Sequence, residues 1–98
     1  MDLKQLQDVM DNTFGERDRA RGVEGTFMWF VEEVGELAAA LRSGTLEQME
    51  GEFADCLAWL VSAANVAGID MDKAIRKFAE GCPYCRSVPC KCPGEAKP

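Results

Sequence analysis

The strongest constraint on the fold is a short turn, Ser43-Gly44-Thr45, between two long segments that share a helical hydrophobic period. Apolar residues recur every three or four positions on both sides of the turn, which predicts helices over about residues 26–42 and 46–67. Gly68 is expected to end the second helix. Because the turn is short, the two helices are expected to fold back on each other as an antiparallel hairpin.

Capping residues mark the starts of three helices. Threonine and aspartate favour the N-cap because their side-chain oxygen accepts a free backbone N–H of the first turn. Thr26 and Thr45 are therefore expected to cap the two hairpin helices. Asp70 or Asp72 is expected to cap a shorter helix that reaches about Glu80.

The remaining segments complete an all-α prediction. Residues 3–13 carry apolar side chains at helical spacing, whereas residues 14–25 are polar and are expected to form a short helical turn or a loop. Nothing in the chain has the pattern of a strand. We therefore predict a bundle of about four helices over residues 1–80, followed by a cysteine-rich tail over residues 81–98.

Both hairpin helices carry an apolar spine with acidic and indole side chains beside it. The spines consist of Phe30, Val34, Leu37 and Leu41 in the first helix, and Met49, Phe53, Leu57, Leu60 and Ala64 in the second. In a hairpin centred on Gly44, residues at equal height have numbers that sum to about twice 44. The resulting pairs are Glu36 with Glu52, Glu33 with Asp55, and Trp29 with Trp59. Four carboxylates are thus predicted to converge, with two indoles farther from the turn.

Converging carboxylates repel one another unless a cation compensates their charge. Mg²⁺ and Mn²⁺ prefer oxygen ligands, and acids at positions i and i+3 lie on one face of a helix. With water and substrate phosphates completing the shell, such a site suits phosphoryl transfer or hydrolysis. The alternative is a solvated acidic face, which is the usual role of a Glu-rich helix. Glu32 points outward and is expected at the surface or behind the ligands.

Composition excludes several classes of protein. A chain of 98 residues fits one small domain, and its net charge of −6 argues against nonspecific nucleic-acid binding, which needs a basic surface. The absence of histidine excludes Ser-His nucleophiles, HExxH zinc proteases and Glu-x-x-His di-iron sites. No apolar run reaches membrane-spanning length and the N-terminus lacks the core of a signal peptide, so a cytoplasmic protein is expected.

The tail predicts a second metal site. Cys82, Cys85, Cys90 and Cys92 have the spacing C-x₂-C-x₄-C-x-C, and four thiolates on short turns suit a structural, tetrahedral Zn²⁺. An iron–sulfur cluster, a redox dithiol or an oxidised tail are the alternatives. Cys56 stands alone in the second hairpin helix and is expected to be a small core residue.

The acidic motif also carries a family resemblance. EEVGE at 32–36 and EFAD at 52–55 resemble the EExxE…ExxD signature of the MazG-like all-α nucleotide pyrophosphohydrolases. The resemblance extends to GERDRARG at 15–22, TFMWFVEEVGELAAALRSG at 26–44 and GIDMDKAIRKF at 68–78, and covers roughly residues 1–80. The tail lies outside it.

The resemblance implies Mg²⁺-dependent hydrolysis of a nucleoside triphosphate to the monophosphate and pyrophosphate. It implies a helical fold completed by homodimerisation, and the expected assembly is a dimer or a tetramer. By motif position, Glu33, Glu36, Glu52 and Asp55 would be the metal ligands. Attack at the α or the β phosphorus stays open, as does the choice of Glu32 or Glu33 as the assisting base.

Basic and aromatic side chains are candidates for binding the nucleotide. The candidates for phosphate contact are Arg19, Arg21, Lys73, Arg76 and Lys77, and the resemblance favours Lys77. Trp29 and Trp59 are candidates for contact with the base, with core packing as the alternative. Asn65 is a candidate for reading a base edge or an ordinary polar residue near a helix end. The competing function is a noncatalytic helical module that binds a partner through its acidic face and knuckle.

Overall fold

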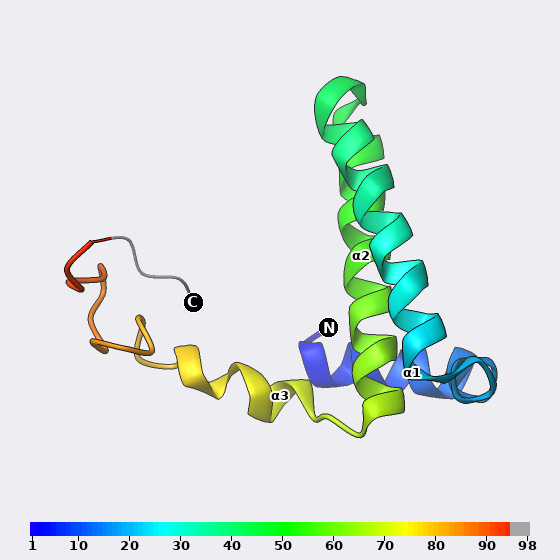
Figure 1. Cartoon of the computed structure of the whole chain (residues 1–98), viewed down its shortest axis with the longest axis horizontal. Coiled ribbons are helices and arrows are strands. Elements are labelled where there is room, and N and C mark those ends of the chain that lie inside the picture. The colour runs from blue at the N-terminus through cyan, green and yellow to red at the C-terminus, as the bar shows by residue number, and fades with distance from the viewer. Residues whose placement is uncertain (95–98) are drawn as a thin grey trace.

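The computed structural model describes residues 1–94, and the last four residues of the predicted tail lie outside them. The elements are α1 (Leu3–Ser43), α2 (Leu46–Ala67), α3 (Met71–Ala74) and the 3₁₀ helix η1 (Ile75–Phe78). No strand occurs in residues 1–94, so the all-α prediction is confirmed. The second part of α1 and all of α2 lie side by side as a long hairpin, and α3 leads the chain away from it (Figure 1).

The hairpin turn forms as its capping residues predict. Thr45 caps α2: its Oγ1 accepts the Gln48 N–H at 3.2 Å, and its own N–H donates to the Gln48 side chain at 2.9 Å. Gly44 donates its N–H to the Ala40 carbonyl at 2.7 Å, which satisfies the end of α1. Gly68 ends α2 in the left-handed conformation. The reciprocal Thr45–Gln48 bonds fix the start of α2 directly after the end of α1, and therefore the height at which the two helices pair.

The prediction of a short turn or loop over residues 14–25, and of Thr26 as an N-cap, is wrong. The segment is helical on both sides of Gly22, where two helices of α1 meet at a kink with a non-helical φ of 87° and ψ of 168°. Thr26 lies inside the helix, is fully buried, and accepts a hydrogen bond from Arg21 Nη1 at 3.3 Å. The second helix of α1 begins directly after the kink at Gly22, before Thr26, so Thr26 does not cap it.

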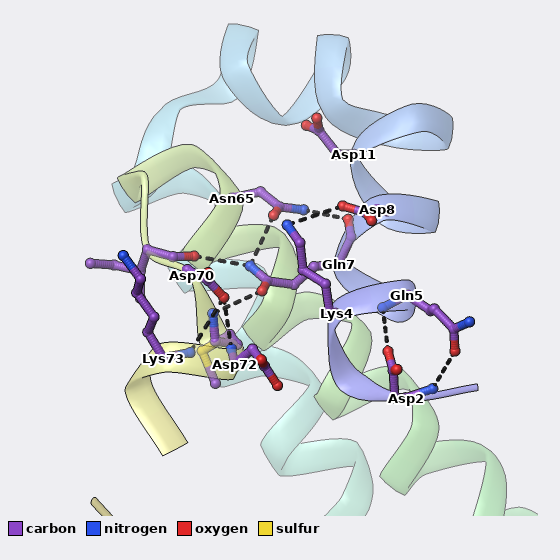
Figure 2. Close-up of polar contacts among 12 residues, drawn as sticks. Asp2, Lys4, Gln5, Gln7, Asp8, Asp11, Asn65, Asp70, Asp72 and Lys73 are labelled. Atoms are coloured by element: carbon purple, nitrogen blue, oxygen red, sulfur yellow. Dashed lines mark hydrogen bonds and ion pairs between the residues drawn. The ribbon is translucent and has the colours of Figure 1, made fainter. Parts of the chain in front are cut away.

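Gln7 holds the first part of α1 across the far end of the hairpin (Figures 1 and 2). Its buried side chain donates to Asn65 Oδ1 at 3.1 Å and to the Ile69 carbonyl at 3.0 Å, and accepts the Met71 N–H at 2.8 Å. Asn65 returns a bond to the Gln7 carbonyl at 3.0 Å. One amide side chain thus joins α1, α2 and the start of α3, and Asn65 serves as its structural partner.

The predicted third helix forms in two short pieces. Asp70 is its N-cap, accepting N–H bonds from Asp72 at 2.9 Å and Lys73 at 3.4 Å. After one α-helical turn the chain tightens into η1, which ends at Phe78, two residues before the expected end.

The apolar spines are only partly covered by the single chain. Val34 and Leu41 on α1, and Phe53 and Leu57 on α2, are between 42 and 54 % exposed. The accessible surface is 7176 Å². A compact monomeric protein of this mass would expose roughly 5500 Å². In residues 1–94 no single helix is long and apolar enough to span a membrane; α2 and Met71–Phe78 pass that test only as a bent pair, on length and composition.

Candidate metal centre

Three carboxylates meet between the hairpin helices. Glu33 comes from α1, and Glu52 and Asp55 come from successive turns of one face of α2. Each offers an oxygen, and these oxygens all lie within 4.8 Å of one another. The pairing follows from the capped turn at Gly44, which sets Glu33 opposite Asp55.

The cluster carries uncompensated negative charge. Glu33 Oε2 and Glu52 Oε2 are buried and have no hydrogen-bond partner in residues 1–94. Burial first, then the adjacent carboxyl of Glu52, and then the charges of Glu52, Asp55 and Glu36 raise the pKa of Glu33 from 4.5 to about 7. Orphaned carboxylate oxygens on facing helices are the ligands that a hard divalent cation prefers. The residues therefore fit Mg²⁺ or Mn²⁺.

Glu36 lies apart from the three gathered carboxylates. It is exposed and offers no oxygen to the cluster, although it is near enough for its charge to act on Glu33. Glu32 is exposed on the outer side of α1, as its helical angle indicates. The role of Glu36 as a ligand stays a prediction.

The two indoles predicted at equal height do stack. The ring centroids of Trp29 and Trp59 are 5.8 Å apart, with an interplanar angle of 13°. The Arg21 guanidinium lies 5.0 Å from the centroid of the Trp59 ring, within range of a cation–π interaction. Asp18 is buried and holds Arg21 through an ion pair of 2.9 Å, and Thr26 binds the same Nη1.

A cavity of about 440 Å³ opens beside the carboxylates. It is lined by Met10, Phe14, Arg17, Asp18, Arg21, Asp55, Ala58, Trp59 and Ser62. Asp55 belongs to both the cavity and the carboxylate cluster, so a molecule in the cavity lies next to the candidate metal site. The apolar floor and the arginines suit a flat ring attached to an anion.

Phe14, Arg17 and Asp18 were not predicted as site residues. They recur at helical spacing with Arg21, a predicted candidate for phosphate contact, and line the cavity together with it. This spacing indicates a helix with one face toward the cavity. From the sequence alone the segment is nevertheless interpreted as a turn or loop, because it is polar and contains glycine. Conversely, Arg19 pairs with Asp11 on the outer surface and is absent from the cavity wall.

Lys77 lies on η1, away from the carboxylates. Its Nζ is 5.0 Å from the ring centroid of Phe78, and it lines a smaller cavity between η1 and the tail. Cys56 is buried as expected, and burial, followed by the charges of Glu33, Glu52 and Asp55, raises the pKa of its thiol. This thiol therefore lies close to the acidic cluster without belonging to it.

The tail gathers its cysteines, which is compatible with the predicted knuckle. The sulfurs of Cys82, Cys85, Cys90 and Cys92 lie within 4.8 Å of one another, and no disulfide joins them. Backbone N–H donation, chiefly from Lys91, lowers the pKa of Cys85 to about 6, whereas the neighbouring sulfurs raise the pKa of Cys92 to about 12.

Comparison with known families gives one match. The MazG nucleotide pyrophosphohydrolase domain matches residues 21–85, which include the hairpin, the three gathered carboxylates and the first two cysteines of the tail. No curated protein matches the chain.

Proposed function

Because the chain belongs to the MazG nucleotide pyrophosphohydrolase domain family, we propose that it hydrolyses nucleoside triphosphates to the monophosphate and pyrophosphate, using Mg²⁺ or Mn²⁺. Members of this family are typically Mg²⁺-dependent. Removing nucleotides from the cellular pool is the role that this reaction serves. We place the protein in the cytoplasm.

The proposal rests on three converging carboxylates, two of which have a buried oxygen without a hydrogen-bond partner within residues 1–94. Glu33, Glu52 and Asp55 bring their oxygens within 4.8 Å of one another, and Asp55 also borders the cavity. A solvated acidic face would spread its carboxylates apart and hydrate each one. Here Glu33 and Glu52 each have one buried oxygen without a hydrogen-bond partner in the described part of the chain, beside the exposed Asp55, which favours a bound cation over a solvated surface.

Each acid has a role in the proposed reaction. Glu33, Glu52 and Asp55 would hold the cation, and the exposed Glu36 is proposed as the fourth ligand. When bound, the cation supplies Lewis-acid polarisation of a phosphate oxygen and of the attacking water. Glu32 or Glu33 is proposed as the base that assists the attacking water.

The cavity is proposed to take the nucleoside. Trp59 offers an aromatic wall, with Trp29 stacked against it, and Arg21 is held in place by Asp18. Lys77 and Arg19 are proposed to contact phosphates. Both lie away from the cluster within one chain, so their contact with a nucleotide at that cluster would require a second subunit.

We propose a homodimer, alone or paired into a tetramer. The half-exposed spine residues Phe53 and Leu57 support it, because a single chain leaves apolar area uncovered that a second hairpin can bury.

A nucleotide panel tests the activity. The full chain is incubated with each NTP and dNTP plus Mg²⁺, and released pyrophosphate is measured. Glu52→Gln is expected to lower kcat/KM at least about 100-fold, since it removes a charged ligand from the cluster. Glu50→Gln, an exposed acid on the same helix, is the matched control and should retain activity.

No pyrophosphate from any nucleotide, with wild type equal to Glu52→Gln, would contradict the proposal. That result would favour a noncatalytic module that binds a partner through the acidic face.

A further inference from the structure

The four cysteines of the tail form a cluster that the proposed hydrolysis does not use. The Sγ atoms of Cys82 and Cys92 are 3.7 Å apart, and those of Cys82 and Cys90 are 3.6 Å apart. A disulfide would bring two sulfurs to about 2.05 Å, so these are separate thiol groups. A tetrahedral ion with Zn–S bonds of about 2.3 Å places its sulfurs about 3.8 Å apart. These two distances match that spacing, and all four sulfurs lie within 4.8 Å of one another, so the cluster is compact enough for one metal ion.

Backbone amides point at three of these sulfurs. The Tyr84 N–H donates to Cys82 Sγ at 3.4 Å, and the Cys92 N–H donates to Cys90 Sγ at 3.4 Å. Both bonds run from residue i+2 back to the cysteine at i, so two turns of the tail repeat one arrangement. The Lys91 N–H donates to Cys85 Sγ at 3.3 Å. Amides directed at sulfur stabilise thiolate ligands and orient them toward a common point.

The backbone is shaped to bring the two cysteine pairs together. Arg86 donates its N–H to the Cys82 carbonyl at 2.7 Å, and Cys82 donates its own to the Ser87 carbonyl at 3.1 Å. Gly81 has a φ of 94°, and a Cβ there would lie 2.7 Å from the Ser87 carbonyl oxygen. Only glycine permits this close approach of the two backbone segments. Gly81 therefore allows the turn that brings the cysteines together.

The tail has little else to hold it together. In the part of it that the structure describes, residues 82–94, no side chain is fully buried, and Tyr84 and Val88 are 67 and 81 % exposed. A segment without an apolar core retains a fixed geometry when a metal supplies the folding free energy. A four-iron cluster sits between its thiolates and would hold them farther apart than the 4.8 Å seen here.

We propose that Cys82, Cys85, Cys90 and Cys92 bind one Zn²⁺ as a structural tetrathiolate site, independent of the carboxylate cluster. The metal fixes the fold of the tail beside η1, where Arg86 pairs with Glu80 at 3.0 Å. A cavity of about 250 Å³ lined in part by Arg76, Lys77 and Arg86 lies at this junction. Loss of zinc is therefore expected to release the tail while leaving the helical hairpin folded.

The test measures metal in the full chain purified under reducing conditions without added zinc. We expect one zinc per chain by elemental analysis. After exchange for Co²⁺, we expect the intense visible absorption of a tetrahedral cobalt–thiolate site. Cys85→Ser and Cys92→Ser are each expected to lose most of the zinc and this absorption. Cys56→Ser is the matched control, because it removes the one cysteine that lies outside the cluster, and should retain both.

Circular dichroism of each variant separates loss of the site from loss of the fold. Helix content equal to wild type in zinc-free Cys85→Ser supports a site confined to the tail. Zinc-free wild-type protein whose five thiols titrate as free and which binds no Co²⁺ would overturn the proposal. An iron–sulfur absorption spectrum, or equal zinc loss in Cys56→Ser, would overturn it as well. Because none of these readouts uses hydrolysis, failure of the zinc site and failure of the proposed activity are distinguishable.

Discussion

Glu33 shows how one position combines core packing with charge. Its helix lies against α2, so the carboxyl is drawn out of water, and the facing Glu52 and Asp55 add repulsion. The pKa of Glu33 rises to about 7, so in the metal-free protein this side chain keeps its proton at mildly acidic pH. Burial of an acid is tolerated here because protonation or a cation can relieve it.

Stability should therefore depend on pH through Glu33. Between pH 4.5 and 7 the unfolded chain ionises this carboxyl while the folded chain keeps it protonated, so its contribution to the free energy of unfolding falls as pH rises. Chemical denaturation in the presence of a chelator measures the free energy of unfolding at several pH values. Between pH 4.5 and 7 this free energy is expected to fall less steeply for Glu33→Gln than for wild type. Saturating Mg²⁺ should also reduce the fall, since it favours the ionised form. Glu32→Gln, at an exposed neighbour, is the control; equal slopes for both variants would contradict the assignment.

Much of the site was predictable from residue spacing, because a capped two-residue link leaves only one register. That register placed Trp29 against Trp59 and Glu33 near Asp55, as the structure has them. The predicted pairing of Glu36 with Glu52 is not found, because Glu52 lies beside Glu33 instead. Residue spacing determines the position of a side chain along its helix and its approximate angle around the helix axis. It does not determine the rotamer or the exact position of the side-chain end. The exposed position of Glu36 and the bonds that hold Arg21 to Asp18 and Thr26 depend on these rotamers. Neither could be predicted from the residue spacing.

At the scale of elements, α1 was predictable in its second part and not in its first. The hairpin helices have an apolar period and clear caps. Residues 14–25 are rich in charge, so their helix is specified by the packing of a few side chains, including the buried Asp18, against the hairpin. At Gly22 the backbone is non-helical, and the first helix of α1 gives way to the second through a kink.

Alanine substitutions at Gly22 and Gly51 are expected to have opposite effects on the free energy of unfolding. Gly22→Ala is expected to lower the free energy of unfolding by about 1–3 kcal/mol, because the backbone at this bend occupies a region that only glycine enters freely. Gly51→Ala is the matched control inside α2, where an added Cβ meets no atom within 4 Å. This control is expected to raise the free energy of unfolding by about 1 kcal/mol, because alanine is the better helix former. Urea denaturation at one protein concentration measures both. Equal effects would show that the bend is not fixed by Gly22.

At the scale of the whole molecule, the chain is extended for its size. Its radius of gyration is 15.7 Å. A compact domain of this length has a radius of gyration of roughly 13 Å. The hairpin exposes Val34, Leu41, Phe53 and Leu57, which form parts of the spines that the sequence predicts as packing faces. The pattern predicts that these residues make packing contacts, and we propose that a partner chain supplies the contacts that the single chain lacks.

A homodimer requires that this face be the contact between chains. Sedimentation equilibrium of the wild type is expected to give at least twice the chain mass of 10.8 kDa. Phe53, 54 % exposed on α2, is proposed to insert into that contact, so Phe53→Glu buries a charge against apolar neighbours and should shift the mass toward one chain. Val9→Glu, at an exposed apolar residue outside the hairpin, is the control and should leave the mass unchanged. The melting temperature of the wild type should also rise with protein concentration, because association stabilises the folded chain by mass action. A mass of one chain at every concentration, with a melting temperature independent of concentration, would contradict the homodimer.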